Sequence, residues 1–255
     1  MSDDLIIGKK HFKSRFILGS GKFSLGMTDR VIRSGGVEIA TLAVRRVNEG
    51  GQENVLDYMP KGVTLLPNTS GARNAEEALT IAQLARELGC GDMIKIEIVR
   101  DTRYLLPDNA ETAKAVRLLA DDGFTPLPYM MPDLTAARDM ADAGAAAIMP
   151  LAAPIGSNRG LLTRDFIKIM VEEIDLPIIV DAGIGRPSQA CEAMEMGCGA
   201  VMANTAIATA ADIPAMAAAF RMAIEAGRAA YLAGLGRVLE DRGEASSPLT
   251  GFLGE

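Results

Sequence analysis

Eight short apolar runs, alternating with longer helical segments, constrain the fold of this chain more than any other feature. The runs cover residues 16–18, 38–42, 63–66, 93–98, 126–129, 147–150, 177–180 and 200–203. Strands that alternate with helical patterns indicate βαβ units and a parallel sheet. Repeated units of this kind close naturally into a barrel, so we predict an α/β fold, a (β/α)8 TIM barrel, with a short N-terminal hairpin.

The domain organisation follows from the length and from the spacing of the helices. The 255 residues match the roughly 250 residues of such a barrel. No Ser/Gly-rich linker divides the chain, and the last long helix is predicted from about Asp212 to Leu235. We therefore predict one domain over 1–255, with a polar C-terminal tail from about 242 to 255.

Composition excludes several classes of protein. Apolar residues make up 49% of the chain and charged residues 23%, the balance of a globular protein with a large core. The net charge of −7 repels nucleic-acid phosphates and anionic membrane surfaces. No apolar run reaches the length of a membrane span, and the N-terminal residues do not form an export signal. We expect a cytoplasmic protein with neither nucleic acid nor membrane as a partner.

Cysteine and histidine content narrows the chemistry. The three cysteines form neither a disulfide framework nor the paired spacing of a zinc site, so we predict no metal and expect the thiols to be dispensable. The single histidine, His11, lies in the predicted hairpin, where an ordinary surface role is expected. Histidine-based catalysis is therefore close to excluded. Acid–base chemistry must come from Lys, Asp, Glu or Tyr side chains.

The run 93–98 carries the most informative pattern. Ile94, Ile96 and Ile98 share one face of this strand, and Lys95 and Glu97 share the other. In a barrel the isoleucines face the helices, which turns Lys95 and Glu97 into the interior; the alternative is a half-exposed strand with a surface ion pair. Burial is expected to lower the pKa of Lys95 and free its amine to attack a carbonyl, with Glu97 moving protons.

Polar residues at two strand ends suggest a second carboxylate and an anion site. Asp181 follows the run 177–180 and is expected at the C-terminal rim, the catalytic face of such barrels, although an Asx turn or helix cap is the alternative. Gly183 comes directly after it, and Asn204 and Thr205 follow the last run. Loops after the seventh and eighth strands form the usual phosphate site of this fold.

Three further segments admit more than one interpretation. The open loop 153–160 could close the pocket, and Arg45-Arg46 either hold an acidic group or form a solvated basic turn. Residues 19–24 suggest a doubly wound nucleotide-binding sheet instead of a barrel. That match lacks the third glycine of the dinucleotide motif and the Gly and Ser/Thr positions of a P-loop.

Taken together, these residues resemble one enzyme family. The segments 94–97, 154–157, 181–185 and 204–207 resemble thiazole synthase of bacterial thiamine biosynthesis. The similarity runs nearly end to end and includes 21–23, 45–46, 66–69 and 246–252. Each motif alone is weak, but their order, each at a strand end, makes the match specific.

The resemblance implies a reaction and its residues. Such enzymes join 1-deoxy-D-xylulose 5-phosphate, a glycine imine (dehydroglycine) and sulfur carried as a C-terminal thiocarboxylate on a ubiquitin-like protein. The product is a thiazole phosphate carboxylate. By resemblance, Lys95 forms a Schiff base with the sugar ketone, while Glu97 and Asp181 move protons. The implied substrate-binding residues are Gly156, Ala182, Gly183, Asn204 and Thr205.

The same resemblance implies partners and leaves alternatives. A sulfur-carrier protein, an enzyme that produces the glycine imine and a homo-oligomeric state are expected, without a cofactor. Ala152 and Asn158 stand where glycine is common in the family, and 130–132 replaces a more polar stretch. Two interpretations compete with this one. The first is another Schiff-base sugar-phosphate barrel, such as an aldolase or a pyridoxal phosphate synthase subunit. The second is a barrel that only binds a phosphorylated metabolite.

Overall fold

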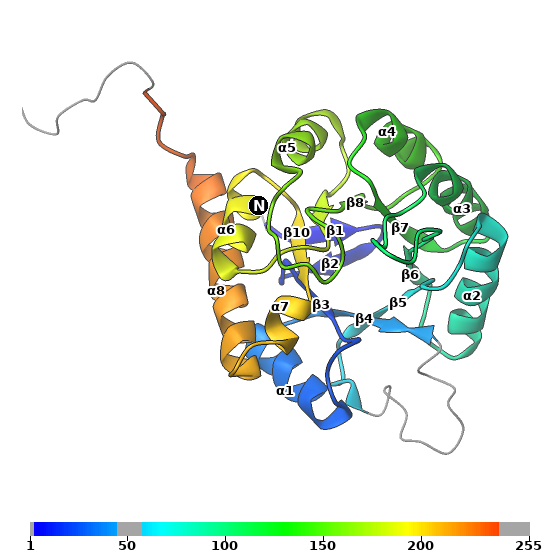
Figure 1. The fold of residues 1–255 in the computed structure, drawn as a ribbon, viewed down its shortest axis with the longest axis horizontal. Helices are drawn as coiled ribbons and strands as arrows, with labels where there is room; N and C mark the ends of the chain where they lie inside the picture. Colours follow the sequence, from blue (N-terminus) through cyan, green and yellow to red (C-terminus); the bar gives the residue numbers. More distant parts are fainter. Residues whose placement is uncertain (1–2, 45–57, 240–255) are drawn as a thin grey trace, which may run out of the picture.

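The computed structural model of the chain describes residues 3–44 and 58–239. Figure 1 looks down a ring of helices that surrounds the strands, with the N-terminal hairpin at the centre. The strands are β1 (Leu5–Ile7), β2 (Lys10–Phe12), β3 (Phe16–Gly19), β4 (Ile39–Ala43), β5 (Thr64–Asn68), β6 (Met93–Ile96), β7 (Thr125–Met130), β8 (Met149–Pro150), β9 (Ile179–Val180) and β10 (Ala200–Ala203). The helices are α1 (Leu25–Gly35), α2 (Ala75–Glu87), α3 (Asn109–Asp121), α4 (Leu134–Asp142), α5 (Arg164–Glu173), α6 (Pro187–Glu195), α7 (Thr205–Ala208) and α8 (Ile213–Ala233).

Eight parallel strands form the barrel. Their order is β8-β7-β6-β5-β4-β3-β10-β9, so each strand lies beside its neighbours in sequence. β8 and β9, at the two ends of this order, are joined by the backbone: the Ile179 amide donates to the Ile148 carbonyl at 2.8 Å, and the Asp181 amide donates to the Pro150 carbonyl at 3.0 Å. The predicted (β/α)8 barrel is confirmed, and the doubly wound alternative is excluded.

The core has an inner and an outer layer because strand residues alternate between the two faces. Ile94, Ile96 and Ile98 pack outward in one buried cluster with helix residues such as Val116 of α3. Met93 belongs to a separate cluster inside the barrel. This alternation confirms the predicted orientation of the fourth barrel strand.

The hairpin closes the barrel at the N-terminal ends of the strands. β1 and β2 pair antiparallel, and Leu5, Ile7 and Phe12 are buried against the apolar residues inside the barrel. His11, on the opposite face of β2, has a side chain that is 61% exposed. The hairpin is thus the predicted one, but its inner face is part of the core instead of lying on the surface.

The helix boundaries follow local capping chemistry. Asn74 accepts a hydrogen bond from the Glu77 amide at 2.8 Å and begins α2, and Asp212 accepts one from the Ala215 amide at 3.0 Å and begins α8. Both starts agree with the predicted ones. Arg45-Arg46 and the predicted polar tail 242–255 lie outside the described residues, and the single-domain organisation of 1–255 stays a prediction.

Candidate active site

All eight sequence-predicted site residues line one cavity of about 180 Å³ at the C-terminal ends of the strands. They are Lys95, Glu97, Gly156, Asp181, Ala182, Gly183, Asn204 and Thr205. They follow or end four different strands, β6, β8, β9 and β10, which meet only in the closed barrel. The fold therefore brings together side chains that are up to 110 residues apart, since Lys95 and Thr205 contribute to the same cavity.

Lys95 lies between two carboxylates. Its Nζ is 2.6 Å from Asp181 Oδ2 and 3.4 Å from Glu97 Oε2. Lys95 and Asp181 are each only 3% exposed, whereas the Glu97 side chain is 14% exposed. Asp181 therefore pairs with Lys95 inside the barrel and does not cap a helix, and the surface ion-pair alternative for β6 is wrong.

The charge state expected for Lys95 needs a correction. Burial acts to lower the pKa of Lys95, as anticipated, but the charges and hydrogen bonds of Asp181 and Glu97 outweigh it, so the pKa lies above its ordinary value. The sequence pattern revealed the burial and not the 2.6 Å contact. Between these two carboxylates the amine is therefore held as an ammonium ion. A nucleophilic amine requires its proton to move, and Asp181 is the nearest acceptor.

Backbone contacts fix both carboxylates relative to the lysine. The Thr69 hydroxyl accepts from the Glu97 amide at 2.9 Å, and the Thr69 amide donates to the Lys95 carbonyl at 3.0 Å. The Asp181 carbonyl accepts from the Ala152 amide at 2.9 Å. Thr69 is fully buried. It belongs to a motif quoted for the resemblance, but no sequence signal showed that it holds the end of β6.

Tyr129 is a second residue that the sequence did not single out. Its ring lies below the ammonium group, with the centroid 5.0 Å from Lys95 Nζ, and its side chain is fully buried. Burial, with Asp181 and Glu97 nearby, keeps the pKa of the Tyr129 phenol well above its ordinary value. The phenol is thus a poor acid at neutral pH, and its ring contributes a cation–π contact that favours the lysine cation.

The predicted anion site is formed by loops with left-handed backbone. Ala182 has a φ of 59° and Gly183 a φ of 79°, and the Gly183 carbonyl accepts from the Gly160 amide at 2.7 Å. A Cβ atom on Gly183 would lie 2.4 Å from Ala153 Cβ. Glycine is required here both for its backbone conformation and because the loop after β8 approaches so closely.

Replacing Gly183 with alanine tests this close approach. We expect the Gly183→Ala variant to lose about 1–2 kcal/mol from left-handed strain and a further ~1–3 kcal/mol from the clash with Ala153. Gly89→Ala is the matched control, because Gly89 has a φ of 81° but open space around it. Urea unfolding gives both free energies of unfolding. Equal losses in the two variants would show that the approach of the loops is not rigid.

The expected departures from the family pattern differ in how they lie relative to the cavity: Asn158 lines it, whereas Ala152 and Met130 do not. Asn158 adopts a φ of 52°, a conformation that glycine favours and that asparagine accepts better than most residues. Ala152 and Met130 are fully buried in the core, whereas Met131, in the same replaced stretch, is 36% exposed. Of these residues, Ala152 contacts an ion-pair partner of Lys95 through its backbone, because its amide donates to the Asp181 carbonyl at 2.9 Å.

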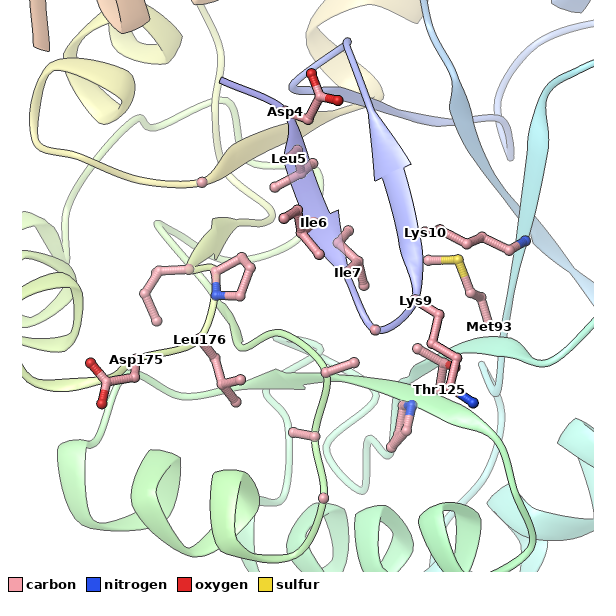
Figure 2. A pocket seen from close by; sticks show the side chains of 18 of the residues that line it. Asp4, Leu5, Ile6, Ile7, Lys9, Lys10, Met93, Thr125, Asp175 and Leu176 are labelled. Carbon is pink, nitrogen blue, oxygen red and sulfur yellow. The ribbon is translucent and has the colours of Figure 1, made fainter. Parts of the chain in front are cut away.

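A larger cavity, of about 1090 Å³, lies at the opposite end of the barrel (Figure 2). The hairpin and the segments that precede β6, β7, β8, β9 and β10 line it. None of the eight predicted site residues belongs to it, and its buried cation Arg15 already donates to Asp3 and to the Gly199 carbonyl at 2.7 Å. We therefore place the chemistry in the smaller cavity.

The remaining candidates for chemistry are not in the smaller cavity. None of the cysteines lines it, and burial raises the pKa of Cys198 to about 12.

Among residues 3–44 and 58–239, no group of three His, Cys, Asp or Glu side chains is placed to hold a metal ion. Within the same ranges, every helix is too short or too polar to cross a membrane.

Comparison with known proteins agrees with this geometry. Residues 6–248 match the family model described as thiazole biosynthesis protein ThiG. A thiazole synthase of Clostridium beijerinckii is 67% identical over 98% of both chains. One from Campylobacter jejuni is 68% identical over 99% of this chain and 97% of its own, and one from Clostridioides difficile is 59% identical over 99% of each.

Solved structures extend the comparison to the fold. The Amycolatopsis orientalis BexX/CysO complex contains a chain that is 32% identical, with a TM-score of 0.83 over 92% of this chain and 98% of that chain. Mandelate oxidase, at 16% identity and a TM-score of 0.61 over 91% of this chain and 78% of that one, shares the fold alone. With a family model that spans nearly the whole chain and relatives above half identity, the chain belongs to the family of the thiazole biosynthesis protein ThiG, the thiazole synthases of thiamine biosynthesis.

Proposed function

We propose that Lys95 attacks the ketone carbon of 1-deoxy-D-xylulose 5-phosphate and forms a Schiff base. The observation that carries this proposal is a buried lysine between two carboxylates, in a cavity whose rim offers an anion site. The amine adds to the carbonyl to give a carbinolamine. Loss of water from the carbinolamine then gives the iminium ion.

The two carboxylates are proposed to move the protons. Asp181, 2.6 Å from Lys95 Nζ, takes a proton from the ammonium group as the sugar binds, which frees the amine. Glu97 is more exposed to the cavity and is placed to take a proton from the sugar carbon next to the iminium. An iminium withdraws electrons better than the ketone it replaces, so that proton becomes easier to remove.

The phosphate of the sugar is proposed to bind between the loops of Gly183 and Thr205. Gly156, Ala182 and Asn204 complete the wall of this part of the cavity. These loops lie at the ends of the seventh and eighth barrel strands, where phosphate commonly binds in this fold. Placing the phosphate there leaves the ketone end of the sugar free to reach Lys95.

The proposed co-substrates are a glycine imine from a separate enzyme and sulfur from a carrier protein with a C-terminal thiocarboxylate. A protein partner is supported by the structural relative BexX, which was solved in complex with CysO. The carrier tail is expected to enter at the C-terminal rim, because the cavity opens there. The homo-oligomeric state, the absence of a cofactor and the cytoplasmic location stay predictions.

Reconstitution tests this function. The purified chain, the sugar phosphate, dehydroglycine and a thiocarboxylated carrier are expected to give the thiazole phosphate carboxylate, detected by mass spectrometry. A carrier that ends in an ordinary carboxylate is the control and should give no thiazole. Product formation that does not need the thiocarboxylate would contradict the proposal, and so would binding of the sugar phosphate without turnover.

A further inference from the structure

Lys22 lies in the same cavity and has no role in the chemistry described so far. It follows β3 and lines the cavity together with Gly156 and Thr205. A Cβ atom built on Gly156 would be 3.8 Å from Lys22 Nζ and 3.8 Å from Thr205 Oγ1. The ammonium group therefore lies at the part of the cavity where the phosphate is proposed to bind.

The loop that carries Lys22 is fixed on both sides of the residue. Before it, the Ser20 hydroxyl donates to the carbonyl of Thr41, in the middle of β4. After it, Phe23 is buried in the outer core, and its amide donates to the Ser20 carbonyl at 3.4 Å. The backbone of this loop is therefore anchored, and only the long side chain of Lys22 is free to adjust to a ligand.

The loop also packs on the end of β10, beside which β3 lies in Figure 1. A Cβ atom on Gly19 would be 2.6 Å from Asn204 Cβ. Such a close approach requires glycine at position 19 and places the loop directly against Asn204, which precedes α7. The sequence 19–24 that suggested a nucleotide site thus borders the proposed phosphate site of the barrel.

Charge distinguishes Lys22 from the other ionisable residues of the cavity. Lys95 is paired with Asp181 and Glu97, so these three groups together carry one negative charge. Among the residues that the structure describes, no carboxylate lies within ion-pair distance of Lys22. A sugar phosphate would add about two more negative charges to the cavity. Of the described residues that line it, Lys22 alone offers an uncommitted positive charge to balance them.

We propose that Lys22 is a binding residue that recognises the phosphate group of the substrate through its ammonium group. This inference rests on the proposed function and adds a side-chain cation to a site otherwise lined by glycine, alanine and neutral polar residues. It assigns to Lys22 the selectivity for the phosphorylated sugar over the free sugar. The lysine is not expected to take part in the bond-forming steps at Lys95.

The test compares two ligands on matched variants. Dissociation constants are measured by calorimetry for 1-deoxy-D-xylulose 5-phosphate and for 1-deoxy-D-xylulose, which lacks the phosphate. Lys22→Ala should weaken binding of the phosphorylated sugar about 10- to 100-fold, the range of one charge-assisted hydrogen bond, and leave the free sugar unchanged. Lys22→Arg, which keeps the charge, should restore most of the affinity. Lys61→Ala, at an exposed lysine before β5, is the control and should change neither constant.

Each outcome separates this inference from the proposed function. Failure of the wild-type chain to bind the sugar phosphate or form an adduct with it would overturn the proposed function itself. Normal wild-type behaviour with unchanged affinity in Lys22→Ala would overturn only the role of Lys22. An equal loss of affinity for both sugars in Lys22→Ala would mean that Lys22 shapes the loop and does not recognise the phosphate. If Lys22→Ala raised the KM for dehydroglycine or for the carrier but not for the sugar phosphate, another anion would bind at Lys22, and the proposal would be contradicted.

Discussion

The Lys95→Arg variant is expected to lose the covalent adduct with the sugar phosphate completely and to lose turnover by a factor of about 10⁴ or more. Guanidinium stays protonated at any pH that proteins tolerate, so arginine cannot supply the free amine that attacks the ketone. It does keep a positive charge between Asp181 and Glu97, so the buried carboxylates retain a partner. The substitution should therefore abolish adduct formation and turnover while the chain remains folded.

Borohydride reduction gives the measurement. In the wild-type chain, reduction in the presence of 1-deoxy-D-xylulose 5-phosphate should fix the sugar on a peptide that contains Lys95, seen as an increase in intact mass and located by peptide mapping. Lys168→Arg is the matched control, because Lys168 is exposed on α5 and its Nζ is 3.9 Å from Glu172 Oε1. That variant should form the adduct normally.

Two results would discard the mechanism. One is trapping of the sugar on a different lysine, and the other is full turnover by Lys95→Arg. Since arginine is larger than lysine and the site is buried, thermal unfolding and calorimetric binding of the sugar phosphate accompany the assay. A variant that binds the sugar phosphate, unfolds near the wild-type temperature and forms no adduct isolates the missing amine as the cause.

The barrel could be predicted because its strands carry a strong local signal. The alternation of Ile94, Ile96 and Ile98 with Lys95 and Glu97 fixes which face of β6 points inward once the fold is a barrel. Strand-end position then placed Asp181 and Asn204 at the same rim. These inferences need only the period of a strand and the geometry of a parallel barrel, both of which the sequence carries.

The features that escaped prediction depend on contacts between distant elements. The distance of 2.6 Å between Lys95 and Asp181, which reverses the expected pKa shift, depends on how β6 and β9 lie across the barrel interior. The buried contacts of Thr69 and the position of the Tyr129 ring below Lys95 also depend on contacts between elements that are distant in the sequence. The hairpin was expected on the surface because lysines flank His11 in the sequence. The burial of Leu5, Ile7 and Phe12 becomes clear only once the end of the barrel that they cover is in place.

The Asp181→Asn variant is expected to separate adduct formation from turnover. Asparagine has nearly the shape of aspartate but carries no negative charge, so one of the two groups that raise the pKa of Lys95 is removed while burial still acts to lower it. The pKa of Lys95 should therefore fall. Turnover should also fall, by about 10²- to 10⁴-fold, because one of the two carboxylates proposed to move protons after the adduct has formed is gone.

The sign of the pH dependence follows from these two effects. In the wild-type chain the raised pKa of Lys95 leaves only a small fraction of the molecules with a free amine at pH 7 before the sugar binds, and this fraction grows with pH. Adduct formation should therefore accelerate with pH through the neutral range. In Asp181→Asn the same rise should occur at least about one pH unit lower, since an opposite charge this close shifts a pKa by about one to three units.

Glu97→Gln provides the comparison within the same site. Glu97 Oε2 lies 3.4 Å from Lys95 Nζ, against 2.6 Å for Asp181, and the Glu97 side chain is also the more exposed of the two. Its removal should shift the pH profile of adduct formation in the same direction but by less. The measurement is the rate of borohydride-trapped adduct formation from pH 6 to pH 10 in the wild-type chain and in both variants. If Asp181→Asn and the wild-type chain have the same pH profile of adduct formation, Asp181 does not hold the proton on Lys95. Loss of a negative charge 2.6 Å from Lys95 Nζ would otherwise shift that profile.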